Sequence, residues 1–206
     1  MPGSIRTPDR ASFVEVNRTQ LRVWDWGDPD APAVICAHGA HDHGRMWDGL
    51  APRIAELGYR VLAPDLRGHG DSGRLGSGHA WVAVTLDLCA LAQWAGAPVG
   101  FVAHSWGAGE AMYASAVMPE IAKWIVNLDG LGPPSDGFHG EDNRTLAESM
   151  AHSFEWAERV MFSPPKVFAS RDDMVARRKS VNVRLSDEWL EHLVEHGSAP
   201  ADGGFV

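Results

Sequence analysis

Cysteine is almost absent from this chain, since Cys36 and Cys89 are the only two among 206 residues. Two cysteines cannot form the disulfide framework that supports many small secreted domains. Each lies in an apolar stretch, AVICAHG or LDLCALA, which favours a small buried hydrophobic residue over a reactive thiol. The fold therefore depends on packing, for which 45% hydrophobic residues and nine tryptophans supply the material.

Long apolar runs and an excess of positive charge are also lacking. No run approaches the ~18 residues that span a bilayer, and the first residues, MPGSIRTPDRASF, lack the apolar core of a signal peptide. With 27 acidic against 18 basic residues the net charge is −9, which argues against nucleic acid or an anionic membrane as partner. We therefore expect a globular, soluble, cytoplasmic protein with neither of these partners.

Strand and helix patterns alternate through the first two-thirds of the chain. The pattern begins with a hairpin, continues with short apolar runs of buried-strand type, and places amphipathic helices between them. The expected strands are 13–17, 20–26, 33–37, 59–63, 99–103 and 122–128, and the expected helices are 46–57, 81–95 and 107–118. This order predicts an α/β fold: a mostly parallel sheet with an N-terminal antiparallel hairpin and helices on both faces.

The character of the chain changes at Gly130. A loop rich in glycine and proline, GLGPPSDGFHG, is followed by helical patterns and by no convincing strand. Ser186 is placed as the N-terminal cap of the last helix. We expect residues 1–133 to form the core and 134–206 a helical cap, with helices over 145–161, 171–179 and 186–196.

The run AHSWG places Ser105 where the strand 99–103 meets the helix 107–118. A serine at such an elbow is held in a strained turn, and small residues two positions before and after it, here Ala103 and Gly107, let the backbone pass closely. The N-terminus of the following helix favours the oxyanion that forms during acyl transfer. Ser105 is therefore the candidate nucleophile; the alternative is a helix N-cap only.

The run His38, Gly39, Ala40, His41 follows the strand 33–37. In a serine hydrolase one oxyanion donor is the N–H of the residue after the nucleophile, here Trp106, and the other comes from this loop, with Ala40 as the best candidate. We expect His38 and Gly39 to support the loop. A metal site built from its histidines is the weaker alternative, because the spacing fits no standard zinc pattern.

Together with this loop and the elbow, the run PDLRGHGDSG (64–73) resembles the α/β-hydrolase superfamily over about residues 12–132. The segment RRKSVNVRLSDEWLEHLVEHG further resembles the serine hydrolase-like proteins of that superfamily. The resemblance implies the α/β-hydrolase fold, no cofactor and no metal. It gives the PDLRGHG loop a structural role, so no catalytic role passes to Asp65, Arg67 or His69.

The partners of the nucleophile are not evident in this sequence. The resemblance implies an order of Ser, then acid, then His, and residues 134–206 show no strands to carry the last two. The chain ends at DGGFV without a stop-like feature, so we expect the last strands and the histidine beyond Val206, and little turnover from these residues alone. Asp129, after the strand 122–128, is a possible acid; alternatively it caps its own loop. The later histidines, His139, His152, His192 and His196, would each require another topology.

The leading hypothesis is a serine hydrolase that cleaves a carboxylic ester, or another acyl bond, of a small molecule through an acyl-enzyme on Ser105. Serine at the nucleophile position speaks against epoxide hydrolase or haloalkane dehalogenase chemistry, for which the family that this sequence resembles uses aspartate. One alternative is a non-catalytic protein that binds a ligand or a partner; another is a lyase or perhydrolase on the same scaffold. We also expect self-association through an unpaired sheet edge after the strand 122–128.

Overall fold

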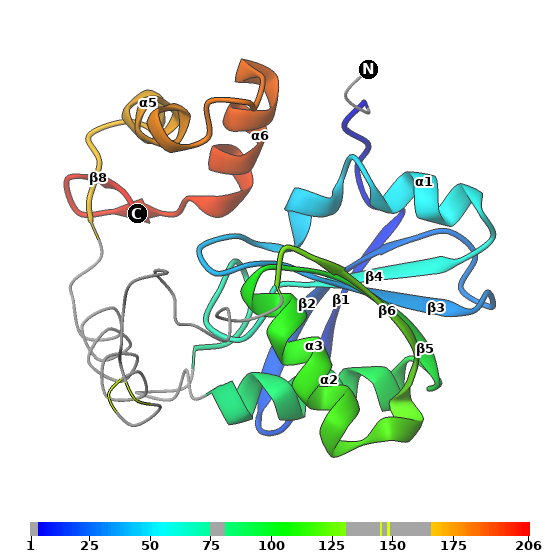
Figure 1. Ribbon diagram of the computed structural model, residues 1–206. Helices are drawn as coiled ribbons and strands as arrows, with labels where there is room; N and C mark the ends of the chain where they lie inside the picture. Colours follow the sequence, from blue (N-terminus) through cyan, green and yellow to red (C-terminus); the bar gives the residue numbers. More distant parts are fainter. Residues whose placement is uncertain (1–3, 75–80, 131–144, 146–147, 149–165) are drawn as a thin grey trace.

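The computed structural model describes residues 4–74, 81–130, 145, 148 and 166–206, and its centre is a six-stranded sheet (Figure 1). The strand order is β1-β2-β4-β3-β5-β6, with β1 and β2 antiparallel to their neighbours and the other strands parallel. The strands are β1 (Arg10–Val16), β2 (Thr19–Trp26), β3 (Ala33–Ala37), β4 (Arg60–Pro64), β5 (Val99–His104) and β6 (Ala122–Leu128). The predicted fold class is confirmed.

The hairpin of β1 and β2 closes on Asn17 and Arg18, whose φ angles are 40° and 65°. Left-handed residues in a two-residue turn match the twist of the flanking strands. The register pairs Val16 with Thr19, so the alternation of apolar residues places Val14, Val16, Leu21 and Val23 in the core.

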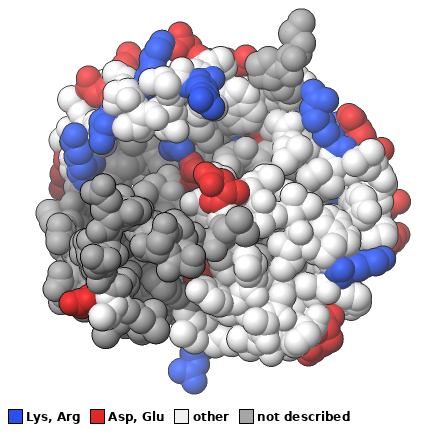
Figure 2. Space-filling model, viewed as in Figure 1, with Lys and Arg blue, Asp and Glu red and all other residues white. Residues whose placement is uncertain are grey.

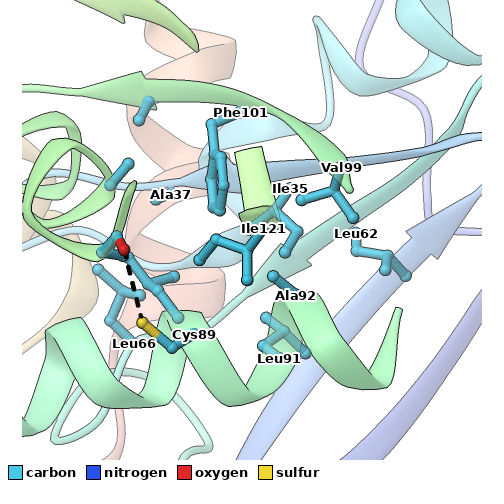
Figure 3. Packing of buried hydrophobic residues seen from close by; sticks show 14 of the residues in the cluster. Ile35, Ala37, Leu62, Leu66, Cys89, Leu91, Ala92, Val99, Phe101 and Ile121 are labelled. Carbon is cyan, nitrogen blue, oxygen red and sulfur yellow. Dashed lines mark hydrogen bonds between the residues drawn. The ribbon is translucent and has the colours of Figure 1, made fainter. Parts of the chain in front are cut away.

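Helices cover both faces of the sheet (Figure 1). On one face lie α2 (Trp81–Trp94) and α3 (Trp106–Val117), and on the other lies α1 (Ala51–Glu56). The larger core cluster lies under α2 and α3, where Ile35 lies between Phe101 and Leu62 on neighbouring strands and Ile121 belongs to the same cluster (Figure 3). Cys89 lies in this cluster, and Cys36 lies in the cluster on the opposite face; both thiols are free and buried, as expected.

The predicted helix 46–57 is interrupted in the structure. A short 3₁₀ helix, η1 (Gly44–Trp47), is followed by α1, in which Pro52 occupies the first turn. Proline has no N–H to continue a helix from before it, but it is well accommodated in the first turn. The predicted end is confirmed, because Gly58 follows with φ of 87°. A second 3₁₀ turn, η2 (Pro119–Ile121), connects α3 to β6.

The C-terminal segment contains helices α5 (Arg171–Val181) and α6 (Asp187–Gly197). Their caps, Ser170 and Ser186, accept hydrogen bonds from the N–H groups of Asp173 and Trp189. The expectation of no strand after Gly130 is wrong: β7 (Pro200–Ala201) and β8 (Gly204–Phe205) form a small hairpin that Phe168 extends by one bridge. Strands this short leave no periodicity in a sequence. Most of the predicted helix 145–161 lies outside the described residues.

Strand β6 pairs with β5 only, among the residues that the structure describes. Its side chains Val126 and Leu128 are 45% and 38% exposed. Self-association through this edge stays a prediction. No helix in the described parts of the chain is long and apolar enough to cross a membrane.

Candidate active site

Ser105 lies at the junction of β5 and α3 with φ of 51° and ψ of −122°. A non-glycine residue in this region is strained, and such strain persists only where the surroundings fix it. Two backbone contacts do so: the Ser105 N–H donates to Leu128 O at 2.9 Å, and the Ser105 carbonyl accepts from the Ala108 N–H at 3.0 Å. The structure therefore gives Ser105 the elbow conformation that the sequence pattern indicates.

Two glycines let the backbone come close to this elbow. A Cβ atom on Gly107 would lie 2.3 Å from the carbonyl oxygen of His38, so α3 can approach the end of β3 only with glycine here. A Cβ atom on Gly39 would lie 2.9 Å from Nδ1 of His104 and 3.3 Å from Cβ of Ser105. The loop after β3 thus passes directly against the nucleophile, where an oxyanion donor is needed.

His38 is fully buried and holds this loop in place. One ring nitrogen, Nδ1, lies 2.7 Å from Gly39 O, and the other, Nε2, accepts the Leu66 N–H at 2.9 Å. Burial lowers the pKa of His38 well below its ordinary value, with His69 adding to the effect. A neutral ring that accepts at Nε2 must carry its proton on Nδ1, which donates to Gly39 O. Both nitrogens are occupied, so this geometry does not favour His38 as a metal ligand.

Trp106 begins α3, so its N–H lies in the first turn and has no acceptor within the helix. Its side chain is held by Glu110, a 1% exposed carboxylate that also accepts the Thr85 hydroxyl at 2.5 Å. Burial raises the pKa of Glu110, and the hydrogen bonds from Thr85 and Trp106 oppose that rise. The His69 ring lies 5.6 Å from the Trp106 ring. Sequence reasoning missed Glu110, because a glutamate in a helix is usually solvated.

Asp129 directly follows β6, whose last residue, Leu128, pairs with His104. This places Asp129 beside the elbow at the carboxyl edge of the sheet. It has φ of 58° and is exposed. The turn is capped by Asn127, which accepts the Gly130 N–H at 2.8 Å. The role of Asp129 as the acid stays a prediction.

The PDLRGHG loop is fixed by two buried acidic side chains. Asp65 accepts the N–H groups of Gly44 at 2.6 Å and Asp71 at 3.0 Å. Arg67 forms two hydrogen bonds of 2.7 Å with the carboxylate of Asp87 on α2. The loop therefore ties β4 to η1 and to α2, which is the structural role expected for it.

Helix α6 docks on η1 through a buried polar network that the sequence did not indicate. Arg45 donates three hydrogen bonds of 2.6 to 3.0 Å to Asp48, whose side chain is 0% exposed. From α6, Nε2 of His192 reaches Asp48 and Arg45 O, each at 3.2 Å, and Nδ1 of His196 lies 3.4 Å from Arg45. Nε2 of His43 contacts Leu193 O at 3.0 Å. These contacts keep His192 and His196 at the interface; His139 and His152 lie outside the described residues.

The docking of α6 is expected to weaken as the pH falls. Burial lowers the pKa of His43, and burial together with Arg45 lowers the pKa of His196 to about 4. A histidine whose pKa is depressed in the docked state takes up a proton more readily once α6 has separated from the core. Its contribution to the stability of docking is therefore complete above about pH 6.5. That contribution is lost progressively as the pH falls from about 6.5 toward 4. Hydrogen exchange of the α6 amides, compared at about pH 7.5 and about pH 4.5, measures this loss.

The control for this pH effect is His41, which is exposed and lies two residues before His43. His196→Gln should make the protection of the α6 amides from hydrogen exchange less dependent on pH. His41→Gln should show the same pH dependence as the wild type. An equal change in both variants, or protection that rises on acidification, would contradict the assignment.

A cavity of about 630 Å³ lies between the η1–α1 region and the helices α5 and α6. Apolar side chains of both parts line it, with Trp189 and Leu193 from α6 and Met46 and Leu50 from the core. His104, the neighbour of Ser105, also lines it. Ser105 is not itself a lining residue, so the cavity reaches the elbow through His104. The volume is typical for small-molecule sites.

A family profile described as the α/β hydrolase fold matches residues 32–163. Because this match covers more than half of the chain, the protein belongs to the α/β-hydrolase superfamily. The thioesterase domain of the curacin biosynthetic pathway has a similar structure, with a TM-score of 0.78 at 25% identity over 95% of this chain and 70% of that one.

Curated relatives carry several hydrolase names. Epoxide hydrolase A of Mycobacterium tuberculosis is 42% identical to this chain, in a match that covers 47% of this chain and 31% of the relative. Lipase LipV of the same organism is 34% identical, in a match that covers 67% of this chain and 51% of the relative. A serine hydrolase-like protein of Dictyostelium discoideum is 33% identical over 82% of this chain and 47% of its own. The chain thus spans about half or less of the length of these three relatives.

Proposed function

We propose that the protein is a serine hydrolase that cleaves a carboxylic ester, or another acyl bond, of a small molecule through an acyl-enzyme on Ser105. The observation that carries the proposal is the elbow conformation of Ser105, with φ of 51° between β5 and α3. A serine in this strained turn, next to the N-terminus of a helix, is the arrangement by which this fold presents a nucleophile.

The proposed reaction begins with attack of the Ser105 hydroxyl oxygen on the carbonyl carbon of the substrate. The hydroxyl proton passes to a histidine supplied by a part of the protein outside the described residues, and then to the leaving alcohol. The N–H groups of Trp106 and Ala40 stabilise the oxyanion. Water then hydrolyses the acyl-enzyme and restores Ser105. Asp129 is the proposed acid that orients the histidine.

The test is covalent labelling of Ser105 by a fluorophosphonate in the whole protein. The label should appear on the peptide that contains Ser105 and be absent after Ser105→Ala, and hydrolysis of p-nitrophenyl butyrate should fall by about 10⁴-fold or more. Ser115, also on α3, hydrogen-bonds to Ala111 O at 2.8 Å and serves as the matched control, since Ser115→Ala should keep both label and turnover.

Several of the relatives are named epoxide hydrolases, so styrene oxide is the matched competing substrate. Hydrolysis of the epoxide without hydrolysis of the ester would overturn the proposal. Absence of both label and turnover in the whole protein would favour the second class of function, a non-catalytic protein that binds a ligand or a partner.

A further inference from the structure

The cavity between the core and the helices α5 and α6 contains buried polar atoms that lack a partner. Among the described residues, Nδ1 of His104 and Nε of Arg178 are both buried without a hydrogen bond, and both residues line this cavity. A buried donor or acceptor without a hydrogen-bond partner lowers the stability of the protein by about 1–3 kcal/mol. Both atoms are covered by the protein, whereas the Arg178 side chain as a whole is 23% exposed and lines the cavity with the charged side chains of Asp42 and Arg184. The chamber therefore combines an apolar wall with a charged end at Arg178.

Arg178 extends from α5 toward the core, and its guanidinium is already oriented. Its Nη2 pairs with the carboxylate of Asp42 in the loop after β3. A guanidinium has five N–H donors in a planar fork, and the pair with Asp42 uses one of them, so terminal N–H groups remain for another acceptor. Asp42 therefore holds the cation at the cavity and also competes for it.

We infer that this cavity takes a small acyl substrate that bears a carboxylate group, and that Arg178 is the specificity-determining residue which binds that group. A carboxylate presents two oxygens to a guanidinium, with charge-assisted hydrogen bonds. The apolar lining, with Trp189 and Leu193, accommodates the hydrocarbon between that carboxylate and the ester. In this inference the ester lies at the end of the cavity lined by His104, the residue that precedes Ser105 in the chain.

This inference rests on the proposed serine hydrolase function only for the ester end of the ligand, so equilibrium binding is measured separately from turnover. The probes are monoethyl adipate, which carries one carboxylate, and diethyl adipate, its neutral counterpart. Titration calorimetry with the Ser105→Ala protein should show about tenfold or more tighter binding of the monoester. Binding with that preference but without turnover of the monoester by the wild type would contradict the proposed function alone.

Three substitutions test the assignment of the arginine. Arg178→Gln should abolish the preference for the monoester, whereas Asp42→Asn should increase it severalfold, because the competing carboxylate is removed. Arg177→Gln is the matched control, since Arg177 lies next to Arg178 on α5 and donates to Ser180 at 3.1 Å. If Asp42 and Arg178 formed only a structural ion pair, both variants should change the preference for the monoester in the same direction. Changes in opposite directions therefore support binding of the carboxylate by Arg178.

Three outcomes would overturn the inference. The first is equal affinity of the Ser105→Ala protein for the two esters, or no binding of either. The second is a preference that survives Arg178→Gln. The third is loss of the preference in Arg184→Gln instead, since Arg184 also lines the cavity but is exposed.

Discussion

Gly107→Ala is expected to destabilise the protein by about 1–3 kcal/mol and to reduce labelling and turnover by about a hundredfold. The added Cβ would lie 2.3 Å from the carbonyl oxygen of His38 and 2.9 Å from that of Ala37. Both atoms belong to the backbone at the end of β3, which is buried and cannot rotate aside. The N-terminus of α3 must therefore shift, and with it Ser105 and the Trp106 N–H.

The measurement is urea unfolding combined with the rate of fluorophosphonate labelling. Gly109→Ala is the matched control on the same helix, because a Cβ there would meet no atom within 4 Å. Alanine favours a helix over glycine by about 0.8–1.0 kcal/mol, so this variant should be slightly stabilised and label at the normal rate. Equal stability changes at positions 107 and 109 would show that the close approach of α3 to β3 has no energetic effect.

The sheet and its elbow were predictable because their signals are local. The run AVICA fills the five-residue strand β3 in the structure, since a strand covered on both faces needs a continuous apolar stretch. Ser105 was predictable for a related reason: its strained turn requires small residues two positions before and after it, and the sequence has Ala103 and Gly107 there. Glu110 has no comparable signature, because nothing in a helical pattern distinguishes a buried carboxylate from a solvated one.

The docking of α6 on η1 could not be predicted, because its contacts join residues far apart in the chain. His192 and Arg45 are separated by 147 positions, and no periodicity relates such pairs. The interruption of the predicted helix 46–57 was missed for a different reason. An apolar pattern with helical spacing continues through η1 and α1, whereas the backbone of α1 begins again at Ala51 with Pro52 in its first turn.

The network at this interface leads to a second large expected effect. Asp48→Ala should lower the free energy of unfolding by about 3–5 kcal/mol, because it leaves a buried cation unpaired. The side chain of Arg45 is 8% exposed and directs three hydrogen bonds to Asp48. Loss of this acceptor also removes one of the two oxygens that His192 contacts from α6. Both α6 and the cavity wall that it forms should therefore lose protection.

The pair of Lys179 and Asp187 is the control for this substitution. It joins α5 to α6 at 2.5 Å, but its side chains are 57% and 68% exposed. Ion pairs in solvent contribute little, so Asp187→Asn should change stability by no more than about 1 kcal/mol. Urea unfolding gives the global effect, and hydrogen exchange of the α6 amides shows where it arises. If Asp48→Ala and Asp187→Asn had equal effects, the buried network would add nothing beyond the apolar contacts of Leu190 and Leu193, and α6 would be held by packing alone.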